Sequence, residues 1–175
     1  MIGSPLFELG ELAKRGWAPI YLDVRTPPIA IPYIRGDATD LHAVIGDASW
    51  AAISTNCVVC HAGMGRYGDP KRDQGDEMMM AELFRILAPG GRLAITFGPV
   101  VAGDEPIVQG NAHRIFTVGE ARRMAVAAGF VVLDMQVFNT ESATWRPPGE
   151  PPVAFTAPRR FDYLSALLER PAPPL

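Results

Sequence analysis

The sequence has little of what marks several common protein classes. Its 175 residues include 2 cysteines and 3 histidines, too few for a disulfide framework or for a metal site built from several cysteine and histidine ligands. The 16 basic and 19 acidic residues give a formal net charge of −3, and no Lys/Arg cluster is dense enough to follow a phosphate backbone. No apolar run approaches a membrane span, and the start lacks the pattern of a signal peptide. We therefore expect a cytoplasmic protein, with reduced cysteines, that binds neither nucleic acid nor membrane.

Hydrophobic residues make up 48% of the chain, which is enough to build a core. A chain of this length is expected to form one domain, and we assign it to residues 1–170. The proline-rich end, residues 171–175, is expected to be a tail.

The stretch of residues 50–99 indicates the fold class. Two short apolar runs, 51–60 and 92–97, are typical of buried strands, and the segment 77–88 between them has the apolar spacing of a helix. The Pro-Gly-Gly sequence at 89–91 ends that helix, because proline cannot continue it and glycine favours a turn. A strand, a helix and a strand in this order form a right-handed crossover, which implies a parallel sheet.

The rest of the chain supplies further elements and loops. Acidic residues near the start and basic residues near the end favour a helix at 5–16. A capping-box sequence predicts the start of a second helix at 117. The predicted elements are helices at 5–16 and 117–128, strands at 18–25, 29–35 and 130–138, and loops at 98–110 and 139–158. Residues 159–170 are ambiguous, since their leucine and alanine content favours a helix.

Several of these segments resemble class I S-adenosylmethionine (SAM)-dependent methyltransferases. The sequence ELFRILAPGGRL at 82–93 is similar to the family's E-x-x-R-V-L-x-P-G-G-x-L segment, which joins its fourth and fifth strands. The stretches 63–70 and 111–116 resemble a branch with a G-L-G-R-Y-G-D loop and an N-x-H-R-I segment. The resemblance covers nearly the whole chain from Ile2 and implies an α/β fold with a doubly wound, mostly parallel sheet. It also places the family's last, antiparallel strand at 159–170, so we expect a strand there.

The resemblance implies SAM as the cofactor and suggests which residues would hold it. Asp23, which ends a predicted strand, would accept both ribose hydroxyls; the alternative is a carboxylate in water. Asp37 would accept from the adenine amino group and the Ala38 N–H would meet a ring nitrogen; the alternative is a turn aspartate that bonds its own backbone. Gly3 and Ser4 would belong to the glycine-rich loop whose backbone approaches the amino-acid part of the cofactor.

The start of the chain departs from the family pattern. Only the tail of the D-x-G-x-G motif is present at Gly3 and Ser4, and the family's central first strand has no counterpart. We therefore expect an N-terminally truncated fold with weakened cofactor binding. The strands at 20–24 and 52–59 would either close directly on each other or be covered by a second copy of the chain, which favours a homodimer. The remaining alternative is that the natural protein starts upstream of Met1.

Polar residues on two loops are candidates for chemistry. His61 or His113 could be the general base for an acceptor hydroxyl, because imidazole titrates near neutrality. The candidates for binding the substrate are Arg66, Tyr67, Asn111 and Arg114. For His113 and Arg114 a structural reading is equally open: a histidine bonded to backbone and an arginine paired with a carboxylate.

Residues 57–61 spell C-x-x-C-H, the attachment motif of c-type haem. Haem attachment needs accessible thiols, whereas this string ends an apolar strand, and no second Cys/His pair completes a metal site. We expect neither haem nor metal here. Cys57 and Cys60 should instead point to opposite faces of the strand, with His61 at its tip beside a ligand crevice.

The leading functional hypothesis is transfer of a methyl group from SAM to a small-molecule acceptor through a hydroxyl. The alternative is a non-catalytic relative that keeps the fold and acts as a binding or partner subunit.

Overall fold

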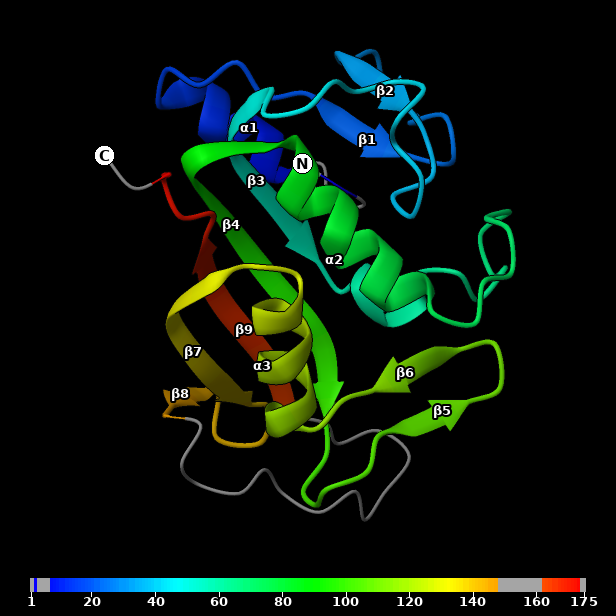
Figure 1. The fold of residues 1–175 in the computed structure, drawn as a ribbon, viewed down its shortest axis with the longest axis vertical. Coiled ribbons are helices and arrows are strands. Elements are labelled where there is room, and N and C mark those ends of the chain that lie inside the picture. Colours follow the sequence, from blue (N-terminus) through cyan, green and yellow to red (C-terminus); the bar gives the residue numbers. More distant parts are fainter. Residues whose placement is uncertain (1, 3–6, 148–161, 174–175) are drawn as a thin grey trace.

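The computed structural model describes residues 2, 7–147 and 162–173. Three α-helices, a short 3-10 helix and nine strands lie within these ranges (Figure 1). In chain order they are α1 Phe7–Lys14, β1 Tyr21–Asp23, β2 Tyr33–Arg35, β3 Trp50–Asn56, the 3-10 helix Val59–His61, α2 Gly75–Ile86, β4 Leu87–Val100, β5 Ile107–Gln109, β6 His113–Ile115, α3 Val118–Ala127, β7 Val131–Asn139, β8 Thr144–Arg146 and β9 Asp162–Glu169. No helix within these ranges is long and apolar enough to cross a membrane.

The main sheet has the strand order β3-β4-β9-β7-β8. β3 and β4 pair in parallel, with Ile53 opposite Leu93. β9 is antiparallel to both β4 and β7, so these two strands run in the same direction on either side of it. The antiparallel strand expected at 159–170 is therefore confirmed as β9, against the helical composition of that segment. Packing between two strands outweighs helix propensity here, since alternate residues of β9 are buried.

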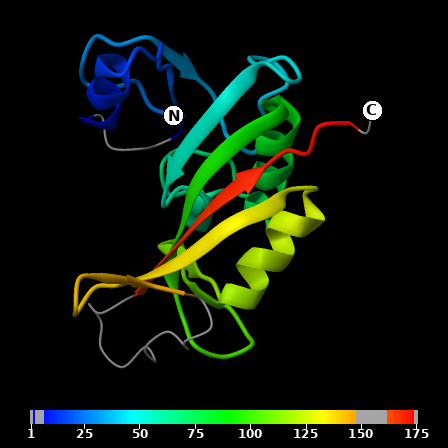
Figure 2. The same cartoon turned by 90° about the vertical axis from the view of Figure 1, so that its left-hand side faces the viewer.

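Helices lie on both sides of this sheet. α2 and α3 cover one face, and α1 lies on the opposite side next to β1 (Figure 2). α2 buries Met79, Met80 and Leu83 against the sheet, as its apolar spacing predicts. α3 begins at the predicted cap, where the Thr117 Oγ1 accepts from the Glu120 N–H at 3.1 Å. This arrangement confirms the predicted α/β fold.

β1 and β2 pair in parallel and are joined to the main sheet through Ile2. Ile2 forms parallel bridges with Leu22 of β1 and with Thr55 of β3, and its N–H donates to the Ser54 carbonyl at 2.9 Å. β1 and β3 therefore do not close directly on each other, so that alternative from the sequence is wrong. The backbone of Ile2 occupies the position between them.

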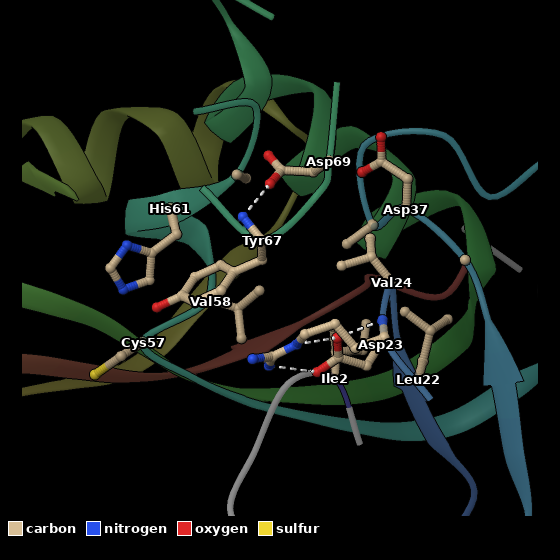
Figure 3. Close-up of a pocket in the computed structure, with 14 residues that line it drawn as sticks. Ile2, Leu22, Asp23, Val24, Asp37, Cys57, Val58, His61, Tyr67 and Asp69 are labelled. Carbon is tan, nitrogen blue, oxygen red and sulfur yellow. Dashed lines mark hydrogen bonds and ion pairs between the residues drawn. The ribbon is translucent and has the colours of Figure 1, made fainter. Parts of the chain in front are cut away.

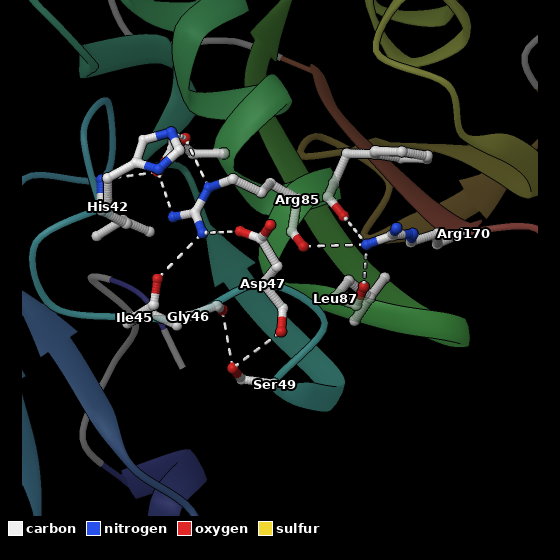
Figure 4. Close-up of polar contacts among 11 residues, drawn as sticks. His42, Ile45, Gly46, Asp47, Ser49, Arg85, Leu87 and Arg170 are labelled. Atoms are coloured by element: carbon white, nitrogen blue, oxygen red, sulfur yellow. Dashed lines mark hydrogen bonds and ion pairs between the residues drawn. The ribbon is translucent and has the colours of Figure 1, made fainter.

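The E-x-x-R pair of α2 holds the loop that follows β2 (Figure 4). Glu82 is buried and accepts from the Leu41 N–H at 2.7 Å. Arg85 binds both carboxylate oxygens of Glu82 and also donates to the Ile45 carbonyl and to Asp47. The motif thus has a structural role, because it fixes the backbone that carries Asp37 and Ala38 a few residues upstream.

Three local predictions are corrected by the structure. The apolar run 51–60 is not one strand: β3 ends at Asn56, Cys57 has a φ of 54°, and Cys60 lies in the 3-10 helix. Cys57 and Cys60 therefore do not alternate across a strand. The segment 98–110 is not a loop throughout, since β4 extends to Val100 and β5 forms a hairpin with β6. The predicted loop 139–158 contains β8, and its remainder from 148 lies outside the described residues.

Candidate functional site

A cavity of about 300 Å³ opens at the carboxyl ends of β1 and β3, beside the loop that follows β2 (Figure 3). Open α/β sheets bind ligands at this edge, and the volume is at the lower end of the range for small-molecule sites. Fourteen residues line it: Ile2, Leu22, Asp23, Val24, Arg25, Gly36, Asp37, Ala38, Cys57, Val58, His61, Ala62, Tyr67 and Asp69. The sequence predictions Asp23, Asp37, Ala38, His61 and Tyr67 are thus brought together.

Asp23 is buried at the end of β1, and both of its carboxylate oxygens are already engaged. Arg25 binds them through its side chain at 3.0 and 2.9 Å and through its backbone N–H at 2.9 Å. The Tyr21 hydroxyl donates at 2.7 Å. Burial raises the pKa of Asp23, but the hydrogen bonds from Arg25 and Tyr21 outweigh it and hold the pKa below its usual value. Asp23 is therefore an anion whose acceptor sites are filled by its own chain.

One carboxylate oxygen of Asp37 accepts no hydrogen bond from the described residues. Its Oδ1 accepts from the Thr39 N–H at 2.9 Å, which is the predicted turn interaction. Its Oδ2 is buried with no hydrogen-bond partner among the described residues, although Arg72 lies 3.8 Å away. Because a buried acceptor without a donor is costly, this oxygen is suited to a donor on a ligand. Ala38 is buried beside it. The predicted contacts Gly3 and Ser4 lie outside the described residues.

His61 is held in one tautomer. Its Nδ1 lies 2.6 Å from the Ala112 carbonyl oxygen, which can only accept, so Nδ1 carries the proton. Nε2 of the neutral ring is then a free base. Burial lowers the pKa of His61, although the hydrogen bond to Ala112 opposes this. The ring packs edge-on against Tyr67, with 5.4 Å between centroids. His61 is therefore a neutral base at neutral pH, at the wall of the cavity.

The loop 63–70 carries Tyr67 into the cavity wall because Asp69 folds it. The two carboxylate oxygens of Asp69 accept from the Gly65 and Tyr67 N–H groups, each at 3.1 Å. The Arg25 guanidinium lies 4.7 Å from the Tyr67 ring centroid, a cation–π distance. Sequence reasoning missed Arg25 as a site residue, whereas Asp69 belongs to the same polar loop as the candidates Arg66 and Tyr67.

The other predicted substrate contacts lie beside the cavity and not in its lining. Arg66 donates to the Ala112 carbonyl at 2.8 Å. Arg114, in β6, donates to the Ala62 carbonyl at 2.6 Å and lies 3.5 Å from Asp76 in the first turn of α2, so it pairs with a carboxylate as in the structural alternative. Asn111 is exposed.

His113 also lies beside the cavity. Its ring centroid is 5.7 Å from that of His61. Burial lowers the pKa of His113 as well, so the two imidazoles lie together as neutral rings at neutral pH.

The two cysteines of the C-x-x-C-H sequence, Cys57 and Cys60, are free thiols. Burial raises the pKa of Cys57 to about 11 and that of Cys60 to about 12. Within the ranges that the structure describes, no group of three or more His, Cys, Asp or Glu side chains could hold a metal ion.

Comparison with known proteins bears on the fold. No family model matches the sequence, and no curated protein is similar to it at a significant level. Among solved structures, the 1,6-didemethyltoxoflavin-N1-methyltransferase of Burkholderia thailandensis, with bound 1,6-didemethyltoxoflavin and S-adenosylhomocysteine, has a TM-score of 0.63 at 16% identity, covering 94% of this chain and 66% of that one. The [4+2]-cyclase SpnF has a TM-score of 0.66 at 15% identity, covering 98% of this chain and 73% of that one. A SAM-dependent methyltransferase of Methanosarcina mazei has a TM-score of 0.61 at 11% identity, covering 93% and 86%.

The chain therefore has the fold of class I SAM-dependent methyltransferases. It spans just under two thirds of the length of the Burkholderia thailandensis enzyme. At these identities the likeness concerns the fold alone, and the chemistry has to be argued from the cavity.

Proposed function

We propose that the protein transfers a methyl group from SAM to the hydroxyl of a small-molecule acceptor. The observation that carries this proposal is the presence of two groups on one cavity: the Oδ2 of Asp37, which accepts no hydrogen bond from the described residues, and the basic Nε2 of His61. The first suits the amino group of an adenine and the second suits an acidic O–H. The similarity in fold to structures named as methyltransferases supports the same reading.

The residues that line the cavity fit the adenine of SAM, but they leave no open acceptor for its ribose. Asp37 and Ala38 offer a carboxylate oxygen and a backbone N–H where an adenine would lie. Asp23 would bind the ribose hydroxyls only after Arg25 releases its carboxylate. SAM, when bound, supplies a methyl group on a positively charged sulfur. The chain contributes orientation of the acceptor and removal of its proton.

His61 is the group that would take the proton. Its Nδ1–H is fixed on the Ala112 carbonyl, which makes Nε2 the acceptor nitrogen of the neutral ring and limits rotation of the ring, while burial favours the neutral form. Tyr67 packs against the ring edge and restricts it further. General-base assistance of this kind contributes about 10²–10⁴-fold in rate.

The binding step is tested by calorimetry with S-adenosylhomocysteine. Asp37→Ala should weaken binding by roughly 10- to 100-fold, the value of a hydrogen bond to a charged group. Asp40→Ala is the matched control, since Asp40 is an exposed acid on the same turn that also pairs with Arg72. Equal affinity in the two variants would remove Asp37 from the site.

The chemical step is tested by methyl transfer from radiolabelled SAM to a panel of phenols and alcohols. His61→Gln should lower kcat by about 10²-fold or more while leaving the affinity for S-adenosylhomocysteine unchanged. A parallel loss of affinity would mean that His61 binds the cofactor and is not the base.

A second candidate, a non-catalytic binding subunit, is favoured by the Asp23–Arg25 pair. An acid that is saturated by its own chain does not need a ribose. SpnF, which is named as a cyclase, has a similar fold, so the fold does not dictate methyl transfer. Absence of any thermal shift with SAM or S-adenosylhomocysteine would select this candidate, because a ligand of the native state raises the melting temperature.

A further inference from the structure

The carbonyl oxygen of Ala112 holds two side chains beside the cavity. It accepts from Nη1 of Arg66 at 2.8 Å and from the Nδ1–H of His61 at 2.6 Å, so the two donor nitrogens lie within two hydrogen-bond lengths of each other. The Tyr67 ring centroid is 5.5 Å from the guanidinium carbon of Arg66 and 5.4 Å from the centroid of the His61 ring. The Tyr67 hydroxyl points to the same side as the His61 ring (Figure 3). Arg66 is thus held next to the base of the proposed function.

Arg66 carries a charge that the described chain does not neutralise. Three other arginines around the cavity each pair with a carboxylate. The pairs are Arg25 with Asp23, Arg72 with Asp37 and Asp40, and Arg114 with Asp76. Arg66 has no such ion pair within residues 2, 7–147 and 162–173, and it donates instead to the neutral Ala112 carbonyl. Asp69, the acid of the same loop, accepts from backbone N–H groups with both of its oxygens.

The charge of Arg66 acts on both imidazoles. Burial is the main cause that lowers the pKa of His61 and of His113, and the positive charge of Arg66 lowers both further. At His61 the Asp69 carboxylate opposes this effect. An anion bound to Arg66 would remove part of the effect and raise the pKa of His113.

We propose that this place beside the cavity binds a small hydroxy acid, with its carboxylate on the guanidinium of Arg66 and its hydroxyl facing Nε2 of His61. In the proposed function, on which this inference rests, the hydroxy acid is the methyl acceptor. The planar guanidinium offers parallel N–H groups that match the two oxygens of a carboxylate. A single unneutralised cation suits a monoanion, whereas a phosphate dianion calls for a second one.

The carboxylate positions the acceptor and is not itself changed. The hydroxyl oxygen gains the methyl group and gives its proton to Nε2 of His61, while the electron pair of the broken carbon–sulfur bond stays on the sulfur of SAM. The product is therefore a methyl ether that keeps a free carboxylate. A neutral acceptor of the same shape would leave the charge of Arg66 without a partner and would bind more weakly.

The binding test uses 2-, 3- and 4-hydroxybenzoate, which present a hydroxyl at three distances from a carboxylate, and the methyl ester of each. NMR signals of the imidazole C–H groups of the three histidines follow binding without SAM. At least one acid should shift the signals of His61 and His113 saturably and bind roughly 10- to 100-fold more tightly than its ester. The signals of His42, which pairs with Glu82, should not move. The pKa of His113 should rise on binding.

Variants of Arg66 separate its role from a structural one. Arg66→Gln should lower the affinity for the acid to that for its ester, and Arg66→Lys should restore part of it, since lysine keeps the charge and loses the fork. Without ligand, Arg66→Gln should raise the pKa of His113, which a merely structural change would not do. Arg122→Gln is the matched control, because Arg122 is an exposed arginine on α3. Its affinity for the acid should equal that of the parent.

The proposal is overturned if acid and ester bind equally, if none of the three acids shifts the His61 signal, or if Arg66→Gln binds the acid as the parent does. Tighter binding of phenyl phosphate than of any acid would assign Arg66 to a phosphate, and methylation of the carboxylate to an ester would reverse the orientation; either result also overturns it. The proposed function fails separately if S-adenosylhomocysteine does not bind. Arg66-dependent binding of the acid would then still support the hydroxy-acid site, in a protein that does not methylate its ligand.

Discussion

Arg25 binds both carboxylate oxygens of Asp23, at 3.0 and 2.9 Å, and its guanidinium lies 4.7 Å from the ring centroid of Tyr67. The arginine therefore spans the cavity mouth from the end of β1 to the loop 63–70. A ribose that binds Asp23 has to displace it. The affinity for a ligand that binds Asp23 therefore depends on the side chain of Arg25, which is itself 56% exposed.

We predict that Arg25→Ala tightens the binding of S-adenosylhomocysteine by roughly two- to fivefold, because an ion pair with an exposed partner is worth up to about 1 kcal/mol. Arg15→Ala removes an exposed arginine elsewhere and controls for net charge. Asp23→Ala should instead lose most of the affinity, since charge-assisted bonds to two hydroxyls are worth about 1.5–3 kcal/mol or more. Calorimetry measures both changes. Weaker binding in Arg25→Ala would show that the arginine holds the ligand.

His61 should make the free energy of unfolding decrease as the pH falls below about 6.5. Its folded pKa lies below the unfolded value of about 6.5, so the unfolded chain binds the proton first as the pH falls. The contribution is intact above the unfolded pKa and is lost as the pH drops through the folded pKa. Urea unfolding at several pH values should show that the free energy of unfolding falls less steeply with decreasing pH in His61→Gln than in the parent. An unchanged slope would mean that His61 titrates normally in the folded protein.

The E-x-x-R pair should be a major contributor to stability. Glu82→Gln leaves the guanidinium of Arg85, which is 16% exposed, without its bidentate partner. Breaking such a buried pair costs about 3 kcal/mol or more in the free energy of unfolding. The exposed Glu77 on the same helix provides the control Glu77→Gln, which should change stability by less than about 0.5 kcal/mol. Equal urea midpoints for the two variants would contradict a structural role for Glu82.

These results show which parts of the site the sequence could predict. Asp23 lies near the end of a predicted strand, Asp37 and His61 follow predicted strands, and the carboxyl ends of neighbouring parallel strands meet at one edge. The pairing of Asp23 with Arg25 could not be predicted, because it depends on the conformation that one exposed side chain adopts. Likewise, the apolar character of residues 51–60 concealed the end of β3, which is set by the positive φ of Cys57.

The hairpin of β5 and β6 was missed for a related reason. Each of its strands has three residues, too few for a periodic pattern to appear. β9 was found only through the family resemblance, since the composition of 159–170 favours a helix. For β9 the deciding contacts come from β4 and β7, which are distant in the sequence.

Gly75 should not tolerate a side chain. It begins α2 against the loop at 62–63, and a Cβ at this position would lie 2.5 Å from the Ala62 carbonyl oxygen and 2.6 Å from the Gly63 Cα. Gly75→Ala therefore has to shift backbone, and we expect a loss of about 2 kcal/mol or more of stability, as for other overpacked sites. Gly119→Ala is the control. Its Cβ would meet only the Thr117 hydroxyl at 4.0 Å, and the change should stabilise α3 by about 0.5–1 kcal/mol. Thermal unfolding compares the two.

The thiols of Cys57 and Cys60 should react slowly, although they lie in a C-x-x-C-H sequence. Burial raises the pKa of Cys57 to about 11 and that of Cys60 to about 12, so the nucleophilic thiolate is scarce at pH 7.5. The Cys60 Sγ also donates to the Cys57 carbonyl at 3.3 Å, and it packs so closely on Gly98 that a Cβ there would lie 2.8 Å from it. Labelling with a thiol reagent should therefore be much slower in the folded protein than in urea, and Cys60→Ala should leave the faster of the two phases, that of Cys57. Rapid labelling of both thiols, a Soret band that survives denaturation, or zinc at one equivalent by elemental analysis would each show that these residues form a reactive or ligand-binding pair.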